Sequence, residues 1–331
     1  MRLLWILFFM NIVFADYGGG YAGSGFRYGS NAREFSLAGA LVADKTPGFY
    51  AFSNPALLQY AKSNQIGLSL QSMSLDRSIQ TFSFVKNIPP SAGVGIALLR
   101  YGTDNIIGRD YMNRETDQFS IYETEGIMSF GVAMGRKIAG GINIKIFFPN
   151  IASEIMDKYG GHQKGNSISW DFGFIYKFNR KLIFGGKFED LNKIYSWEIL
   201  EPCASDNEQR IFQEKPPKIS KIGLAYSGYK NISIYFQEDI VNIPDKYINY
   251  RTRLGIEYRL SNNVKLRLGC KQARGTRTSD DKIDGFNLKS SFGIGAPLKV
   301  WQRQYIQLDY ALDLGSVGEG LSHLFSFSLK F

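Results

Sequence analysis

The chain has 331 residues, of which 44% are hydrophobic and 21% charged, and its formal net charge is +9 at pH 7. These near-average fractions exclude a largely disordered chain, and only two cysteines and two histidines exclude a disulfide-stapled mini-fold and a Cys/His zinc cluster. Glycine (35), tyrosine (19) and phenylalanine (25) are numerous, which is typical of strands and turns and not of a helical bundle.

Residues 1–15 have the organisation of a secretory signal. Met1 and Arg2 give a short basic start, an apolar run follows to Phe14, and Ala15 is a small residue where a signal peptidase can cleave. The apolar run is shorter than the roughly 20 residues of a membrane-spanning helix, which disfavours an anchor. We therefore expect export, a mature chain that begins at Asp16, and membrane insertion only through strands.

Residues 16–63 differ from the rest of the chain in composition and period. The Gly/Tyr/Ser-rich stretch at their start contains a Gly-x-Gly-x-x-Gly spacing, but no strand precedes it, which disfavours a dinucleotide site. Residues 31–44 have apolar side chains near helical spacing, so we expect a short helix with Asn31 as its N-cap. Pro47 and Pro55 prevent this helix from continuing.

From Asn64 onward the apolar period changes to two, which is the period of a β-strand. Apolar and polar side chains alternate over about ten residues, as from Ile168 to Phe178, and a tilted strand of this length spans a bilayer core. Fourteen such segments are predicted as strands, at 64–74, 77–86, 91–101, 125–136, 138–148, 167–178, 181–189, 218–228, 230–239, 250–260, 263–273, 284–295, 300–311 and 321–331.

The connections between these segments alternate in length after the second strand. Short turns, as at 179–180, alternate with long connections, as at 102–124, 149–166 and 190–217. This pattern is typical of a transmembrane β-barrel, whose sheet closes because strands in hydrocarbon cannot leave N–H and C=O groups unpaired. A soluble β-sandwich shares the periodicity. The signal sequence, strand length and loop pattern favour an all-β transmembrane barrel of about 14 antiparallel strands.

The last strand carries a separate signal. Phe325, Phe327, Leu329 and Phe331 lie on its apolar face, and the printed sequence ends on that phenylalanine. Outer-membrane barrels present such an amphipathic last strand to the barrel-assembly machinery, so we expect these side chains to act as an assembly signal. An ordinary last strand is the alternative.

Two blocks of the chain resemble the PorV/PorQ outer-membrane proteins, relatives of the FadL long-chain fatty-acid transporters. Residues 31–58 match the family's N-terminal block, and residues 305–331 resemble its closing hairpin. The matching residues of the first block are Arg33, Gly39, Ala40, Asn54, Pro55 and Ala56. Residues 263–272 resemble a Leu-Arg-x-Gly strand of the family, although Cys270 stands where an aromatic residue is common.

The resemblance implies a 14-stranded barrel whose N-terminal segment folds into the lumen as a hatch. With the signal peptide at 1–15 inferred above, the chain then divides into a flexible N-terminus and hatch at 16–63 and an outer-membrane barrel at 64–331. The hatch residues would then be the Arg33, Gly39 and Asn54-Pro55-Ala56 of the matching block. The hatch either moves with substrate or only fills the lumen.

The family divides in function. PorV receives cargo of the type IX secretion system and hands it to a surface-attachment enzyme, PorQ is associated with the same system, and FadL-type members pass hydrophobic solutes sideways through the wall. The resemblance implies a non-enzymatic outer-membrane component that supports secretion or surface attachment. The alternative is a FadL-like transporter of small hydrophobic solutes. The implied partners are outer-membrane lipid, the barrel-assembly machinery, and secretion-system proteins, secreted cargo or hydrophobic small molecules.

No catalytic or metal-binding constellation stands out in the sequence. His162 and His323 have no Cys or carboxylate at ligand spacing, and Cys203 and Cys270 are expected in a loop and a strand. A Gly-x-Ser-x-Gly elbow and a Walker loop are both absent from the sequence. We therefore expect no enzyme activity, no metal and no cofactor, and the spread of the positive charge disfavours nucleic acid as a partner.

The polar faces of the predicted strands are rich in cations. They would either attract anionic groups within the low-dielectric wall or pair with carboxylates of the hatch and loops. The residues of this expected basic lumen face are Lys145, Lys177, Arg253, Arg259, Lys265, Arg267 and Lys271, with Asp171, Glu257 and Asp309 against them. The polar loops at 104–125 and 201–217, with scattered aromatics, would either dock partner proteins or be solvated surface.

Overall fold

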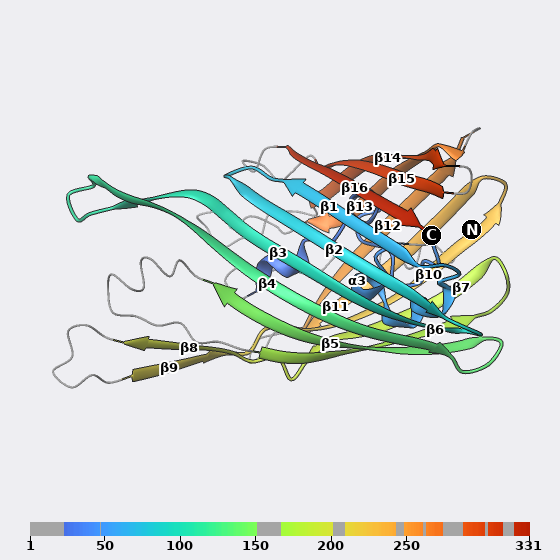
Figure 1. Cartoon of the computed structure of the whole chain (residues 1–331), viewed down its shortest axis with the longest axis horizontal. Coiled ribbons are helices and arrows are strands. Elements are labelled where there is room, and N and C mark those ends of the chain that lie inside the picture. The colour runs from blue at the N-terminus through green and yellow to red at the C-terminus, as the bar shows by residue number, and fades with distance from the viewer. Residues whose placement is uncertain are drawn as a thin grey trace.

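The chain forms a closed antiparallel β-barrel and a separate two-stranded sheet (Figure 1). The computed structural model describes residues 23–46, 48–150, 167–200, 209–242, 248–260, 263–273, 287–301, 304–313 and 321–331. Strand β1 (Gln65–Ser72) pairs with both β2 (Arg77–Ile88) and β16 (Ser322–Lys330), so the sheet closes on itself. The prediction of a 14-stranded barrel is confirmed, and the β-sandwich alternative is excluded. The expected signal sequence lies outside the described residues.

Each wall strand pairs with its neighbours in sequence order, except that β7 pairs with β10. The exception arises because β8 (Tyr195–Leu200) and β9 (Gln209–Glu214) pair only with each other. The other wall strands are β3 (Ala92–Arg109), β4 (Glu115–Ala133), β5 (Ile138–Asn150), β6 (Ser167–Lys177), β7 (Leu182–Leu191), β10 (Lys218–Tyr229), β11 (Ile232–Asn242), β12 (Ile248–Arg259), β13 (Lys265–Ala273), β14 (Asn287–Trp301) and β15 (Gln304–Asp313).

The end of the barrel that carries the long connections, here the outer end, contains more strand than predicted. The connection expected at 102–124 was wrongly predicted as a loop, because β3 and β4 continue there as a two-stranded ribbon (Figure 1). The connection expected at 190–217 likewise contains β8 and β9. A ribbon that projects from the wall needs no continuous apolar face, so the alternation that reveals wall strands is lost.

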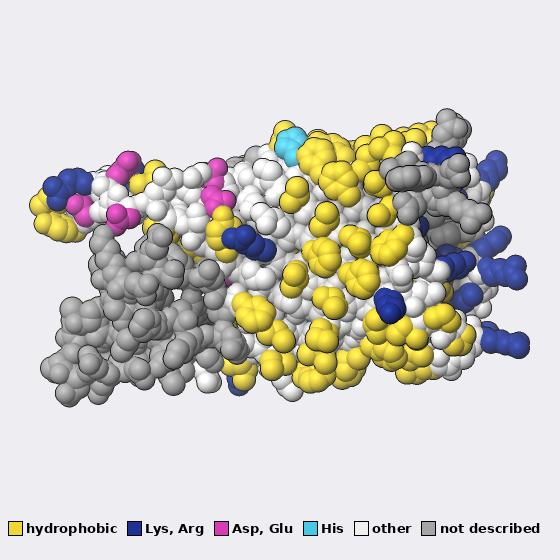
Figure 2. Space-filling view, in the orientation of Figure 1, with side chains coloured by type: hydrophobic (Ala, Val, Ile, Leu, Met, Phe, Trp, Pro, Cys, Tyr) yellow, Lys and Arg dark blue, Asp and Glu magenta, His cyan; other side chains and the backbone are white. Residues whose placement is uncertain are grey.

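The wall alternates between a lumen face and an apolar outer face. Leu68 and Phe325, on the outer face, are each 50% exposed, whereas Ala97 and Asn143, on the lumen face, are fully buried. Apolar side chains cover the middle of the wall in Figure 2. This belt is the surface that a transmembrane barrel presents to lipid. None of the described helices combines the length and the apolar character needed to span a membrane.

Residues 24–61, here called the lumen segment, pack against lumen-facing side chains of the wall (Figure 1). The segment contains η1 (Ser24–Arg27), α2 (Ala32–Ser36), α3 (Tyr50–Ser53) and η2 (Pro55–Tyr60). Asn31 caps α2 as expected, its side chain accepting from the backbone N–H of Glu34 at 3.0 Å. The helix is shorter than the predicted 31–44 because Ala38 and Gly39 adopt left-handed φ angles of 53° and 81°.

Candidate functional site in the barrel lumen

Glycines on the inner face of the wall provide the seat for the lumen segment. A Cβ atom added at Gly93 of β3 would lie 2.5 Å from the Leu58 carbonyl oxygen, and one at Gly185 of β7 would lie 2.5 Å from that of Val42. Because Cβ atoms do not approach other heavy atoms this closely, only glycine admits the backbone of the segment here. Gly131, Gly141 and Gly269 approach the backbone of the segment in the same way, whereas Gly67, Gly173, Gly223 and Gly293 approach its side chains.

Asn54 joins two parts of the lumen segment to the wall. Its fully buried Nδ2 lies 2.9 Å from the carbonyl oxygen of Val42 and 3.1 Å from that of Gly186 on β7. Its Oδ1 accepts from the backbone N–H of Ala56 at 3.0 Å. Pro55 takes the first position of η2, where a missing N–H has no cost. The structure therefore places the Asn-Pro-Ala triplet at a contact between segment and wall.

Arg33 lies at the centre of a buried ion-pair group. Its guanidinium pairs with Asp44 of the lumen segment and lies 3.2 Å from Glu257 Oε2 on β12. Arg267 on β13 lies 2.8 Å from the same Glu257 oxygen and 2.8 Å from Asp309 Oδ1 on β15. These five residues are called the Arg33 cluster below. They fix the first half of the lumen segment to one side of the wall.

Gly39 lies where the segment turns after α2. A Cβ atom at this position would clash with the guanidinium of Arg253 on β12. Arg253 Nη1 donates to the Ala38 carbonyl at 3.0 Å, and its Nη2 lies 2.6 Å from Asp239 Oδ2. The positive φ and the close approach together explain why glycine stands at this position.

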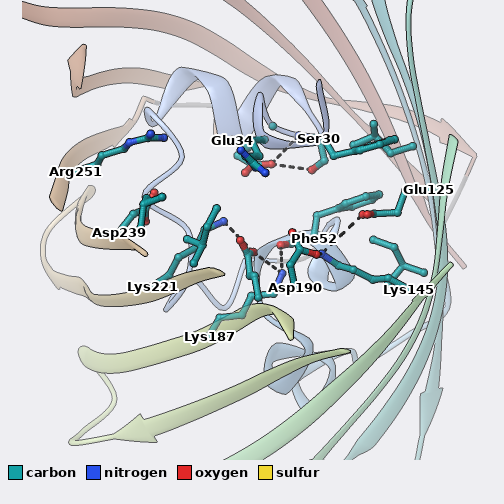
Figure 3. Close-up of a pocket in the computed structure, with 18 of the residues that line it drawn as sticks. Ser30, Glu34, Phe52, Glu125, Lys145, Lys187, Asp190, Lys221, Asp239 and Arg251 are labelled. Carbon is teal, nitrogen blue, oxygen red and sulfur yellow. Dashed lines mark hydrogen bonds and ion pairs between the residues drawn. The ribbon is translucent and has the colours of Figure 1, made fainter. Parts of the chain in front are cut away.

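A second charged group, the outer cluster, lines a pocket beside the lumen segment (Figure 3). Lys187 Nζ lies 2.8 Å from Glu189 Oε1 and 3.2 Å from Asp171 Oδ2, and it donates to the Phe52 carbonyl at 2.8 Å. The cluster contains four lysines and four carboxylates, so its formal charges balance. Its members are Glu125, Lys145, Asp171, Lys187, Glu189, Asp190, Lys193 and Lys221.

A bulge in β7 supplies two of these carboxylates. The register between β6 and β7 shifts near this point, and Asp190 adopts a positive φ of 58°. The consecutive residues Glu189 and Asp190 are therefore both buried, each 8% exposed. The Asp190 N–H donates to Asp171 Oδ1 at 3.0 Å.

The structure places all seven predicted cations on lumen-facing positions, but it changes the charge balance. Lys145, Arg253 and Arg267 form ion pairs with carboxylates. Next to the segment, Glu125, Glu189, Asp190 and Asp239 also face inward, so carboxylates that were not predicted stand beside these cations. Lys271 lies over the Phe35 ring at 5.7 Å. No ion pair of Lys177, Arg259, Lys265 or Lys271 is found within the described parts of the chain.

The predicted docking loop at 104–125 forms a hairpin whose tip, between β3 and β4, is held by hydrogen bonds. Asp110 accepts hydrogen bonds from the backbone N–H groups of Arg114 and Met112 at 2.9 and 2.8 Å. Backbone donation from Arg114 is the main reason that the pKa of Asp110 lies below its ordinary value. At the tip Tyr111 is 90% exposed and Met112 58%. Part of the second predicted loop, including Cys203, lies outside the described residues, as does His162.

The predicted assembly signal lies on the outer face of the last strand. Phe325, Phe327 and Phe331 are 50%, 43% and 49% exposed, and Leu329 alternates in phase with them. The Phe331 N–H donates to the Asn64 carbonyl at 3.0 Å, next to the start of β1. The role of these residues in assembly stays a prediction.

The cavities beside the lumen segment are small. One of about 60 Å³ adjoins the outer cluster, and one of about 20 Å³ adjoins the Arg33 cluster. A larger cavity of about 520 Å³ opens at the other end of the barrel and is lined by Arg259, Lys265, Gln307 and Lys330 among others. Within the described ranges, no group of three or more His, Cys, Asp or Glu side chains is arranged to hold a metal ion.

Comparison with known proteins relates this fold to hydrocarbon channels. The P. putida toluene transporter TodX superposes with a TM-score of 0.61 at 14% identity, over 92% of this chain and 98% of that one. The CymD monoaromatic hydrocarbon channel gives 0.59 at 11% identity, over 92% and 98%. A Pseudomonas aeruginosa FadL homologue gives 0.59 at 11% identity, over 91% and 98%.

These likenesses show that the chain has the fold of FadL-type outer-membrane barrels, which is the coarser part of the resemblance seen in the sequence. No protein-family model matches the sequence, and no curated protein matches it. The PorV/PorQ part of the resemblance finds no support in these comparisons. The structures that the chain resembles are transporters or channels and not enzymes.

Proposed function

We propose that this protein is an outer-membrane channel for small hydrophobic molecules and that the lumen segment is its hatch. The observation that carries the proposal is that the chain itself fills the lumen: the cavities beside the segment are only about 60 and 20 Å³. A general porin keeps a water-filled channel open instead. Three hydrocarbon channels or FadL-type proteins share the fold, which supports the choice of solute.

The contacts between hatch and wall are of a kind that can open. Arg33 and Glu257 form an ion pair across the interface, and Lys187 donates to the Phe52 carbonyl. Such charge-assisted contacts exchange with water at a net cost of about 1.5–3 kcal/mol each, which is small enough for transient opening. A hydrophobic solute would pass when the hatch shifts, and the hatch would return to its glycine seat afterwards.

We propose in addition that the protein is exported and assembled in the outer membrane. The signal at residues 1–15 would direct export, and the mature chain would begin at Asp16. The barrel-assembly machinery would recognise Phe325, Phe327, Leu329 and Phe331 and insert residues 64–331 into the outer membrane. The apolar outer belt of the wall supports this location.

A reducible lock between hatch and wall tests the proposal. A Cβ atom at Gly255 on β12 would lie 3.1 Å from Leu37 Cβ, which is shorter than the roughly 3.5–4.5 Å of a disulfide, so a small outward shift of the segment brings the pair into range. The pair Leu37→Cys/Gly255→Cys is made in a background with Cys203→Ser and Cys270→Ser. Uptake of a labelled monoaromatic hydrocarbon and a labelled long-chain fatty acid is measured in Gram-negative host cells without their own transporter.

The oxidised double variant is expected to lose uptake and to regain it after reduction. Gly255→Cys alone is the matched control, because it introduces the same side chain without the cross-link. If the wild-type chain gives no uptake above empty cells, the channel function is wrong. If the oxidised lock transports as well as its reduced form, the hatch is not the gate.

A second candidate function is support of protein secretion or surface attachment in the manner of PorV or PorQ. The hydrogen-bonded outer tip favours it, because Tyr111 and Met112 are exposed on the paired β3–β4 ribbon beyond the wall. Aromatic anchors with a polar rim are typical of protein-binding surfaces. Deletion of the gene followed by profiling of secreted and surface proteins tests this function, and an unchanged profile would count against it.

A further inference from the structure

The end of the barrel opposite the outer ribbon, here the inner rim, carries a ring of cations. It consists of the short turns and of the strand ends that flank them (Figure 2). Eight Lys and Arg side chains are exposed there: Lys62, Lys86, Arg136, Lys137, Arg180, Lys181, Lys230 and Lys299. Arg259 and Lys330 lie at the same end but line the cavity inside the barrel. Among the residues that the structure describes at this rim, there is no Asp or Glu.

The β3–β4 ribbon at the outer end has the opposite charge. Residues 103–123 of the β3–β4 ribbon and its tip contain five carboxylates and only two arginines. Both arginines are engaged, Arg109 with Glu115 at 2.8 Å and Arg114 with Asp110 at 2.8 Å. The ribbon and the inner rim, at opposite ends of the barrel, therefore differ in the sign of their charge.

Aromatic side chains lie next to the cations of the inner rim. Tyr176 and Phe178 pack edge to face, with ring centroids 4.8 Å apart, and Phe178 is 50% exposed. Tyr229 is 59% exposed, and Lys230 Nζ lies 5.9 Å from the centre of its ring. Aromatic rings next to lysines mark the level where hydrocarbon gives way to lipid headgroups, because the lysine stem stays in the apolar layer while its ammonium reaches water.

We propose that the ring on the inner rim binds the anionic headgroups of phospholipids in the membrane leaflet at that end. The distribution of the cations favours lipid over a docked protein. They occur at the end of β2, on the β4–β5, β6–β7 and β10–β11 turns, at the end of β14 and just before β1. A docked protein would cover one side of the rim, whereas an annulus of lipid contacts every turn. This inference is independent of what the channel transports.

Native mass spectrometry of the full chain in detergent tests this inference. The protein is titrated with phosphatidylglycerol and, separately, with phosphatidylcholine, and the bound lipids are counted. The rim variant is Lys137→Gln/Lys181→Gln, and the matched control is Lys215→Gln/Lys218→Gln at the outer end. All four lysines are exposed, so neither variant removes a buried contact. Only protein with the gel mobility of a folded barrel is compared.

The wild-type chain is expected to prefer phosphatidylglycerol. In the rim variant the ratio of phosphatidylglycerol to phosphatidylcholine affinity should fall roughly fivefold for each removed charge. In the control variant this ratio should stay unchanged. The preference should also vanish at high salt, since the Debye length falls from about 30 Å at 0.01 M to about 3 Å at 1 M.

An equal loss in both variants would mean a general effect of net charge and would overturn the proposal. A wild-type chain without preference for the anionic lipid would overturn it as well, and an acidic protein would then be the fitting partner for the ring.

Discussion

Removal of the Lys187 ammonium should destabilise the closed barrel more than any exposed substitution. Its side chain is 1% exposed, and it holds two carboxylates and the Phe52 carbonyl at 2.8–3.2 Å. Breaking a buried ion pair by removing one partner costs about 3–5 kcal/mol, because the other charge stays buried. Without Lys187, each carboxylate still has another lysine: Lys145 Nζ lies 3.1 Å from Asp171 Oδ2, and Lys221 Nζ lies 2.9 Å from Glu189 Oε1. The lower end of this range therefore applies.

Lys187→Met keeps the length of the side chain and removes only its charge and donors. The free energy of unfolding is measured by urea titration of the refolded protein in detergent, with tryptophan fluorescence as the signal. We expect a loss of about 3 kcal/mol. Lys181→Met, at an exposed turn, should stay within about 0.5 kcal/mol of the wild type. If Lys187→Met and Lys181→Met have the same free energy of unfolding, the outer cluster does not stabilise the barrel and the reasoning is wrong.

Three further substitutions test the seat, the hatch contacts and the assembly signal. Gly131→Ala should cost about 1–3 kcal/mol in the same titration because its Cβ would meet the Pro55 carbonyl, whereas Gly48→Ala, with open space around it, should cost little. Asn54→Ala should cost about 2–3 kcal/mol, since buried carbonyl groups lose their donor; a change under about 0.5 kcal/mol would contradict the assignment. Phe331→Ala should lower the amount of folded barrel in host outer membranes but not refolding in detergent, and equal amounts in membranes would rule out the signal.

The wall of the barrel could be predicted from the sequence because lipid on one side imposes strict alternation. From Ile168 to Phe178 every second residue is apolar, and the structure has a strand there that faces outward with those residues. The same rule placed the strand ends within a few residues for most of the wall. It failed on the β3–β4 ribbon, where neither face contacts lipid and the polar sequence looks like a loop.

The charged lumen could be predicted only in part. The alternation of side chains along a strand predicts that Lys145 and Arg267 face the lumen. It does not predict the carboxylates with which they pair. Glu125 lies where a loop was expected to end, and Asp190 faces inward only because β7 bulges. The glycine seat could have been predicted from the same alternation, because Gly141, Gly173 and other glycines occupy lumen-facing positions on successive strands. Such a row predicts that something packs closely against the inside of the wall.

A polar lumen fits a hydrophobic solute once the needs of the hatch are considered. The lumen segment is mostly irregular, so many of its backbone groups have no partner within a helix or strand, and buried groups of this kind must be paired. The wall supplies partners: Arg253 donates to the Ala38 carbonyl, Asn143 to that of Ala51, and Gln237 accepts from the Val42 N–H. The inward polarity is therefore accounted for by the chain's own backbone and gives no reason to expect a polar cargo. The four lysines and four carboxylates of the outer cluster likewise pair with one another, so the cluster carries no net charge that would favour an ionic cargo.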